Sequence, residues 1–256
     1  MPFKSPRFAG NAVLEEILAD PDTGTKKLAK HSPEDAVRLA QKALIDLHWV
    51  EPYRRADGTI LVPQQFVDGD YGPWTTATVL AYKKRYGICY PPGDPNGTYD
   101  GYTGPRTLQR LDQHCHLLDE ASAAISARVA ELLATGAVQS IEIHADGLGL
   151  TVKPIRSSPG AYTSAVIDGE VGAIIYKHGL GALAVYGDLY VEWVSRELQT
   201  GTGDATDTLG FPISDLLRGA GQEVLQVELG ALTRDTATGA VTVTMTPGAT
   251  VLRYEE

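Results

Sequence analysis

The chain has 256 residues, of which 43% are hydrophobic and 21% are charged. This balance is typical of folded proteins and excludes extended disorder, and the length suits two ordinary domains. No apolar run is long enough to span a bilayer, so we expect no membrane insertion. The N-terminus lacks the apolar core and cleavage site of a signal peptide, so we expect synthesis in the cytoplasm without one.

The formal net charge is −10, and it is unevenly distributed along the chain. Residues 1–120 carry 14 basic and 16 acidic side chains, whereas residues 121–256 carry 8 and 16. Binding to nucleic acid requires clustered Lys and Arg, which the chain lacks, so we expect no nucleic-acid partner. Anionic polymers would also be repelled, so a polymeric ligand should be recognised through neutral groups.

The first strong helix signal begins near residue 32. Ser32 is expected to cap this helix and Pro33 to occupy its first turn, where a missing N–H costs nothing. Apolar residues then follow at helical spacing up to about His48, namely Val37, Ala40, Leu44 and Leu47.

An internal repeat follows, in which residues 68–75 recur 32 positions later as residues 100–107. Each copy predicts a tight turn that opens a helix, because glycine permits positive φ and proline suits the first helical turn. A second apolar stripe, Val79, Tyr82 and Tyr86, ends at Gly87, and a third begins with Leu108 and Leu111. The shared turn residues are Asp68, Gly69, Gly72, Pro73 and Thr75, and Asp100, Gly101, Gly104, Pro105 and Thr107.

A Leu-Ala-Gln-Lys-Ala-Leu helix followed by two Asp-Gly-x-x-Gly-Pro-x-Thr turns resembles the peptidoglycan-binding-like family, here over residues 32–116. The resemblance implies a three-helix bundle that holds wall fragments or serves only as a scaffold. Tyr82 and Lys83 stand where the family usually has Phe-Gln. If the domain binds glycan, exposed Tyr71, Trp74 and Tyr102 are the expected stacking residues, because aromatic rings cover pyranose C–H groups. The alternative is that Trp74 and Tyr82 belong to the core, which spacing favours for Tyr82.

The N-terminal segment, residues 1–31, carries a second resemblance. Its stretch from Arg7 to Leu18 resembles the openings of peptidoglycan-binding-like proteins associated with phage-tail-like contractile injection systems. The alternative is an amphipathic helix that packs on its own domain, through Val13, Leu14, Ile17 and Leu18.

Residues 117–136 predict a connecting helix, with Leu118, Ile125, Val129 and Leu132 at helical spacing and Thr135-Gly136 as its stop. The pattern then alternates, which predicts a β-rich domain over residues 137–256. We expect residues 141–143 to pair with residues 148–152 across an Asp146-Gly147 turn, and a helix near residues 188–198.

Residues 172–185 are repeated at residues 230–243, an offset of 58, and Leu209-Gly210-Phe211-Pro212-Ile213-Ser214-Asp215 lies between the copies. This heptad, with Trp193 and the flanking Gly-Ala hairpins, resembles the LGFP repeat family of actinobacterial envelope proteins. The resemblance implies a β-rich module that attaches proteins to the envelope. Only about one and a half units are present, so a docking module is the alternative. We expect Phe211-Pro212 to form a buried turn rather than to contact a ligand.

Catalytic signals are few. His114-Cys115-His116 is the densest group of metal-ligand residue types, but neighbours two apart on a helix do not share a face. Transpeptidase Ser-His-Gly-Cys, Gly-x-Ser-x-Gly and His-Glu-x-x-His motifs do not occur. We expect no enzyme and no cofactor or metal, while a toxin activity in the C-terminal half stays open. Cys89 and Cys115 are free or bonded to each other; the sequence does not decide.

These signals together predict an α+β protein that recognises bacterial cell-wall glycan without catalysis. It would act at the envelope or within an exported, phage-tail-like particle. The alternatives are a structural, adaptor or cargo protein of a contractile injection system, and a zinc-dependent wall hydrolase that uses His114 and His116.

Overall fold

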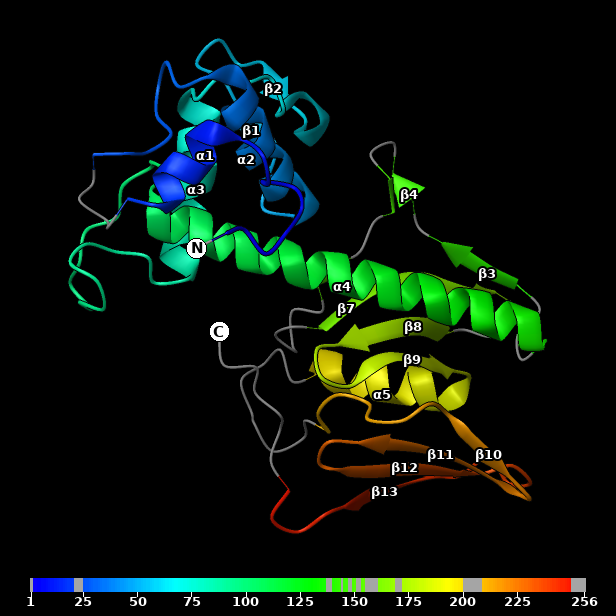
Figure 1. Ribbon diagram of the computed structural model, residues 1–256. Coiled ribbons are helices and arrows are strands. Elements are labelled where there is room, and N and C mark those ends of the chain that lie inside the picture. Colours follow the sequence, from blue (N-terminus) through cyan, green and yellow to red (C-terminus); the bar gives the residue numbers. More distant parts are fainter. Residues whose placement is uncertain are drawn as a thin grey trace. The chain divides into compact units, whose positions relative to one another are not determined.

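The computed structural model describes residues 2–20, 25–136, 140–143, 145–146, 149–150, 153–154, 161–168, 172–199 and 209–249. The chain divides into two compact units, residues 1–119 and 120–256. Helices and antiparallel sheets are both present, so the predicted mixed α+β class is confirmed (Figure 1). No helix of the described residues is long and apolar enough to cross a membrane.

The first unit is built mainly from helices. They are α1 (Ala12–Leu18), α2 (Glu34–Asp46), α3 (Pro73–Arg85) and the first part of α4 (Pro105–Thr135), with a small β1 (Tyr53–Arg54) and β2 (Ile60–Leu61) hairpin and a 3₁₀ turn at Pro63–Gln65. The predicted apolar stripes face inward, and Tyr82, Leu108 and Leu111 are fully buried. Tyr82 is therefore a core residue, as its spacing predicted.

Two expectations for the helix boundaries are wrong. Ser32 does not cap α2: Pro33 stands at the cap position without a side-chain bond, while Ser32 Oγ accepts a hydrogen bond from the Ala29 N–H at 2.9 Å. The expected boundary between residues 116 and 117 lies inside α4, which runs unbroken from Pro105 to the predicted stop at Gly136. Its apolar positions continue through the expected boundary, so nothing there ends the helix.

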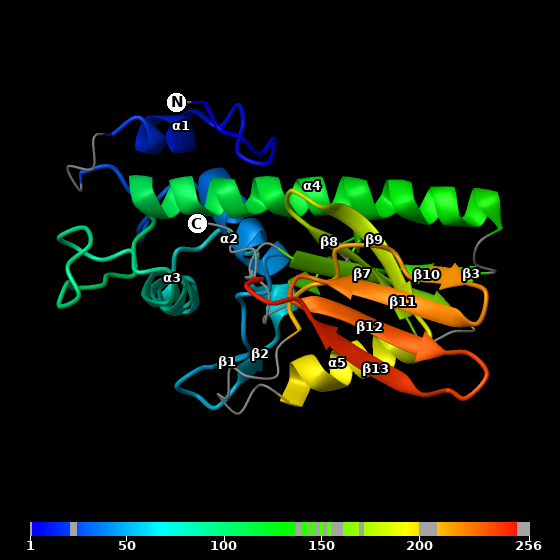
Figure 2. The same cartoon turned by 90° about the horizontal axis from the view of Figure 1, so that it is seen from below.

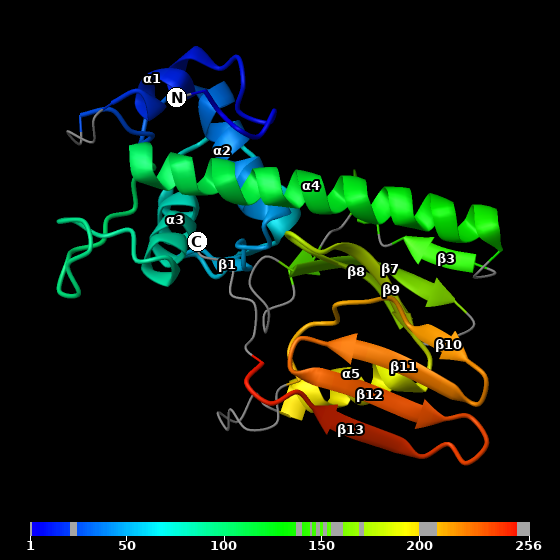
Figure 3. The ribbon, with the colours of Figure 1, turned by 60° about the horizontal axis from the view of Figure 1, so that its bottom comes forward.

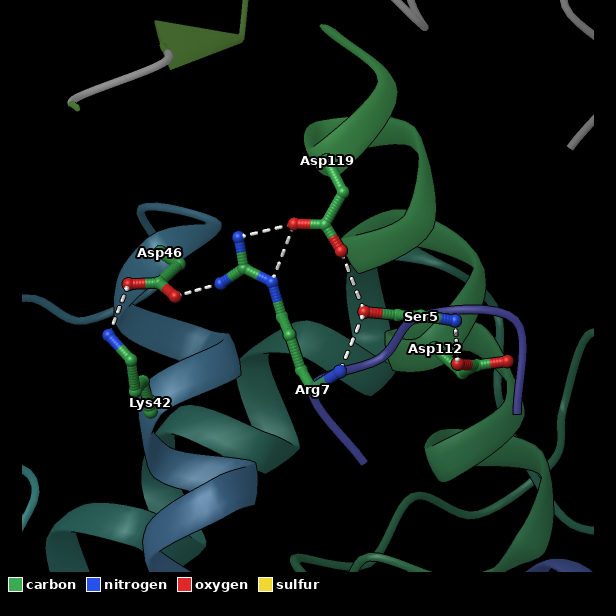
Figure 4. A network of polar contacts seen from close by, with 6 residues as sticks. All are labelled: Ser5, Arg7, Lys42, Asp46, Asp112 and Asp119. Carbon is green, nitrogen blue, oxygen red and sulfur yellow. Dashed lines mark hydrogen bonds and ion pairs between the residues drawn. The ribbon is translucent and has the colours of Figure 1, made fainter. Parts of the chain in front are cut away.

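The N-terminal segment belongs to the first unit. Leu14 and Ile17 of α1 are buried, and Leu28 forms an antiparallel bridge with Thr103. Figure 4 shows the polar contacts that fasten residues 5–7 to α2 and α4. Arg7 donates from Nε and Nη2 to Asp119 at 2.9 and 2.7 Å and pairs with Asp46, while the Ser5 hydroxyl donates to Asp119.

The second unit contains two main antiparallel sheets. One has the order β3 (Ser140–Ile143), β7 (Ala161–Asp168), β8 (Gly172–Lys177), β9 (Gly181–Tyr186), with β6 (Lys153–Pro154) also on β7. The other has the order β10 (Leu217–Gly219), β11 (Gln222–Val227), β12 (Gly230–Asp235), β13 (Val241–Met245). β4 (Ala145–Asp146) and β5 (Gly149–Leu150) form a separate small pair.

The expected pairing of residues 141–143 is wrong. β3 pairs with β7, Ile141 opposite Ile167, while among the described residues Ala145 pairs with Leu150 and Asp146 with Gly149. Gly147, Leu148 and Val152 lie outside the described residues. The long-range partner gives β3 a place in a larger sheet, which a local two-stranded hairpin does not offer.

Helix α5 (Asp188–Gln199) forms where a helix was predicted, and it packs against both main sheets of this unit (Figure 1). Its Leu189 and Trp193 share one core with Ile175 and Val185 of the first sheet and Leu225 and Leu232 of the second. The 58-residue repeat corresponds to two hairpins, β8–β9 and β12–β13. Every residue of β8 is buried, as expected of a strand covered on both faces.

Candidate functional site

The two repeated turns of the first unit are held by side chains from the preceding helices. Gln41 of α2 donates from Nε2 to Asp68 Oδ1 at 2.8 Å and accepts the Gly69 N–H at 2.9 Å. Lys83 of α3 donates to Asp100 Oδ1 at 2.5 Å. This contact, with the bond from the Tyr102 N–H, outweighs the opposing effect of burial and lowers the pKa of Asp100. The repeated aspartates Asp68 and Asp100 are therefore already bonded to the helices that precede them.

Tyr71 does not offer a free ring for stacking. It is 3% exposed, and its hydroxyl lies 2.9 Å from both the Gly101 carbonyl and Thr103 Oγ1, so it joins the first turn to the second. Burial raises the pKa of its phenol well above the usual range. Gly101 is required here, because a Cβ at that position would lie 2.3 Å from the Thr76 side chain.

Trp74 is also enclosed, at 8% exposure. Its ring meets Phe66 edge-on, with centroids 5.0 Å apart, and stacks on Tyr53 at 5.8 Å, while Nε1 donates to the Glu51 carbonyl. The expectation that Tyr71 and Trp74 are exposed is therefore wrong, because the loop of residues 49–72 and the second turn cover them. Of the three expected stacking residues, only Tyr102 is exposed, at 41%.

Tyr102 is one of three exposed tyrosines between α3 and α4. Tyr90 is 65% exposed and Tyr99 36% exposed, and Lys27 Nζ lies 4.4 Å from the Tyr102 ring centroid. We call Tyr90, Tyr99 and Tyr102 the tyrosine surface. Tyr90 and Tyr99 were not among the expected binding residues; the signal for them is an aromatic residue at each end of a Pro- and Gly-rich stretch.

The loop that carries the tyrosine surface is held by several internal bonds. Tyr90 and Thr98 exchange backbone hydrogen bonds at 2.9 Å, and the Cys89 thiol lies 3.3 Å from the carbonyls of Pro91 and Asp94. Arg106 of α4 donates to the Cys89 carbonyl at 2.8 Å. A loop fixed in this way presents its aromatic rings with little ordering cost on binding.

The predicted histidine cluster is divided between different surroundings. His114 is buried, its Nδ1 lies 2.9 Å from the Tyr82 hydroxyl, and burial together with Arg110 lowers its pKa to about 4. Within the described part of the chain, no three His, Cys, Asp or Glu side chains are arranged to hold a metal ion. Both cysteines are buried and free, and burial raises the pKa of the Cys115 thiol.

Phe211 and Pro212 of the Leu209–Asp215 heptad are buried, as expected, but the heptad is an irregular segment rather than a turn, and its Ile213 is exposed. Leu209, Phe211 and Pro212 are buried, and Trp193 donates from Nε1 to the Gly210 carbonyl at 2.9 Å. One end of the heptad runs beside β11, where Pro212 bridges Val227. The other end reaches β9, where Asp215 Oδ1 accepts the Ala184 N–H at 2.8 Å.

Beneath the heptad lies a buried ion pair between Lys177 and Glu228, whose side chains are 3% and 1% exposed. Glu228 also accepts the Phe211 N–H at 2.9 Å. Gly210 has φ +75, and a Cβ there would lie 2.8 Å from the Glu228 side chain, so both its conformation and its surroundings require glycine.

Comparison with known proteins gives no family for this chain. No family model matches the sequence, and no curated protein matches it.

Proposed function

We propose that the chain is a non-catalytic binding protein that recognises bacterial cell-wall glycan through the tyrosine surface. In this proposal the first unit is a three-helix peptidoglycan-binding-like domain, and the second is an LGFP-like module at the cell envelope or on an exported particle. The observation that supports it is the exposure of Tyr90, Tyr99 and Tyr102 beside a loop held by internal hydrogen bonds. Aromatic faces suit pyranose C–H groups and need no positive charge, consistent with an acidic chain.

Sedimentation with insoluble peptidoglycan sacculi tests this proposal. Saturable pelleting of the wild type is expected, and Tyr90→Ala, Tyr99→Ala and Tyr102→Ala combined should abolish it. Ile60→Ala with Val62→Ala is the matched control, because these side chains are also exposed but lie on the β1–β2 hairpin. Pelleting that survives the tyrosine changes, or that the control removes equally, would contradict the assignment.

A second candidate is a docking or cargo protein of a contractile injection particle. It is supported by the structural use of the turn residues: Gln41 bonds the first turn, Lys83 bonds the second, and Tyr71 joins the two turns. A motif used in this way gives a scaffold without needing a sugar. Absence of pelleting by a folded protein, together with co-purification with sheath, tube or spike proteins, would favour this candidate.

A further inference from the structure

Within the described residues, strand β13 is the outermost strand of its sheet and pairs with β12 alone (Figures 2 and 3). Two backbone bonds fix which of its groups point outward: Asp235 N–H to the Ala240 carbonyl at 3.0 Å and Thr246 N–H to the Leu229 carbonyl at 2.8 Å. Bonded and non-bonded pairs alternate between these limits in an antiparallel ladder. Val241, Val243 and Met245 therefore turn their backbone N–H and C=O groups away from β12.

Among the described strands of this unit, the other edges are shorter or covered. β10 has three residues, with Arg218 in its middle, and the Ala184 N–H and C=O of β9 bond Asp215 Oδ1 and the Leu216 N–H. β13 reads Val-Thr-Val-Thr-Met, without a charge, a proline or a bulge. Natural sheet edges usually carry one of these protections, and an edge without them pairs readily with another strand.

The sequence of β13 is also suited to pairing with itself. A two-fold axis at Val243 places Val243 opposite Val243 and Val241 opposite Met245, and all of these residues have outward backbone groups. Thr242 then lies opposite Thr244 on the exposed face, and threonine pairs of this kind stabilise sheets. No like charges meet, because the strand has no charged residue. We infer that β13 is a homodimer edge, at which two copies of this chain join their sheets in an antiparallel, two-fold arrangement.

Sedimentation velocity of the full chain over a range of concentrations tests the inference. A single strand pair is a small interface, so we expect a reversible dimer with a dissociation constant on the order of 10–100 µM. Thr242→Lys with Thr244→Lys places like charges opposite each other and should raise this constant about tenfold. Thr242→Lys with Thr244→Glu places opposite charges there and should dimerise at least as tightly as the wild type.

Both double variants change only exposed side chains, so folding should be preserved. Val243→Pro is a further variant, because it removes an N–H that points away from β12 and leaves the β12 ladder intact. It should abolish dimerisation. A monomer at all concentrations up to about 200 µM, well above the expected constant, would overturn the inference. A dimer equally strong in the wild type and both double variants would overturn it as well.

Discussion

The Lys177–Glu228 pair is the residue-scale feature with the greatest consequence for stability. Two charges buried to this degree are tolerated because they neutralise each other and because Glu228 also bonds the Phe211 N–H. The Lys177 ammonium lies 5.2 Å from the Phe211 ring centroid. The pair thus joins the end of β8 to the heptad and to the residue after β11.

We expect Glu228→Ala to lower the free energy of unfolding by about 3–5 kcal/mol, because it leaves a buried ammonium and a buried N–H without their acceptor. Urea denaturation followed by far-ultraviolet circular dichroism measures the change. Glu192→Ala is the control. It removes a partly exposed ion pair with Arg196, one turn further along the same helix, and should lower the free energy of unfolding by under about 0.5 kcal/mol. Equal losses in the two variants would contradict this account.

His114 gives a pH dependence whose sign follows from its lowered pKa. The pKa is about 4 in the folded chain and 6.5 in the reference state, so the unfolded state takes up a proton first as the pH falls. The free energy of unfolding should be unaffected by His114 above about pH 6.5. Below this pH it should fall, by up to about 3 kcal/mol at pH 4.

Comparison with His114→Gln isolates this effect from the carboxylates that titrate in the same range. The difference in unfolding free energy between wild type and variant should shrink as the pH falls from 7 to 4. A constant difference across this range would show that His114 does not titrate between the two states.

At the scale of elements, the N-terminal segment is attached by charge and hydrogen bonds as well as by burial. The Asp112 carboxylate accepts the N–H groups of Lys4 and Ser5, and Arg7 lies between Asp46 of α2 and Asp119 of α4 (Figure 4). The guanidinium reaches both helices at once, which the single ammonium of lysine cannot reproduce.

Arg7→Ala should therefore release the segment, costing about 1–3 kcal/mol for its charge-assisted bonds. Amide hydrogen exchange of residues 2–20 should accelerate more than exchange in α3. Lys42→Ala is the matched control, because Lys42 contacts the same Asp46 at 3.5 Å from a more exposed position. Unchanged exchange in Arg7→Ala would show that the buried Phe8 and Leu14 suffice to hold the segment.

The elements differ in how far the sequence predicted them. The turns, the stripes of α2 and α3, helix α5 and the two repeat hairpins follow from local spacing and glycine positions. The partner of β3 could not be predicted from local spacing, because β3 pairs with β7, about 25 positions away along the chain. The burial of Tyr71 and Trp74 was also beyond local reasoning: Tyr71 is covered by the second turn and Trp74 by Phe66 and Tyr53.

At the scale of the whole molecule, the net charge of −10 bears on the proposed recognition of wall glycan. Binding through neutral sugar groups should be opposed by anionic wall polymers nearby. Sacculi stripped of such polymers should therefore pellet more of the protein than unstripped sacculi.

Raising the salt concentration should reduce this difference, because screening weakens the repulsion. The fraction of protein that pellets with each kind of sacculi, at low and at high salt, measures this difference. Stronger pelleting with unstripped sacculi at low salt would contradict recognition through neutral groups.

The fastening of residues 4–7 has a consequence for how the chain folds as it is synthesised. The partners of these residues, Asp112 and Asp119, lie 107–114 positions further along. Residues 4–7 therefore leave the ribosome well before α4 and must wait, at roughly 5–20 residues per second, until α4 has followed them. For several seconds the apolar side chains of Phe8 and Leu14 have no completed core, so we expect this segment to expose apolar surface during synthesis.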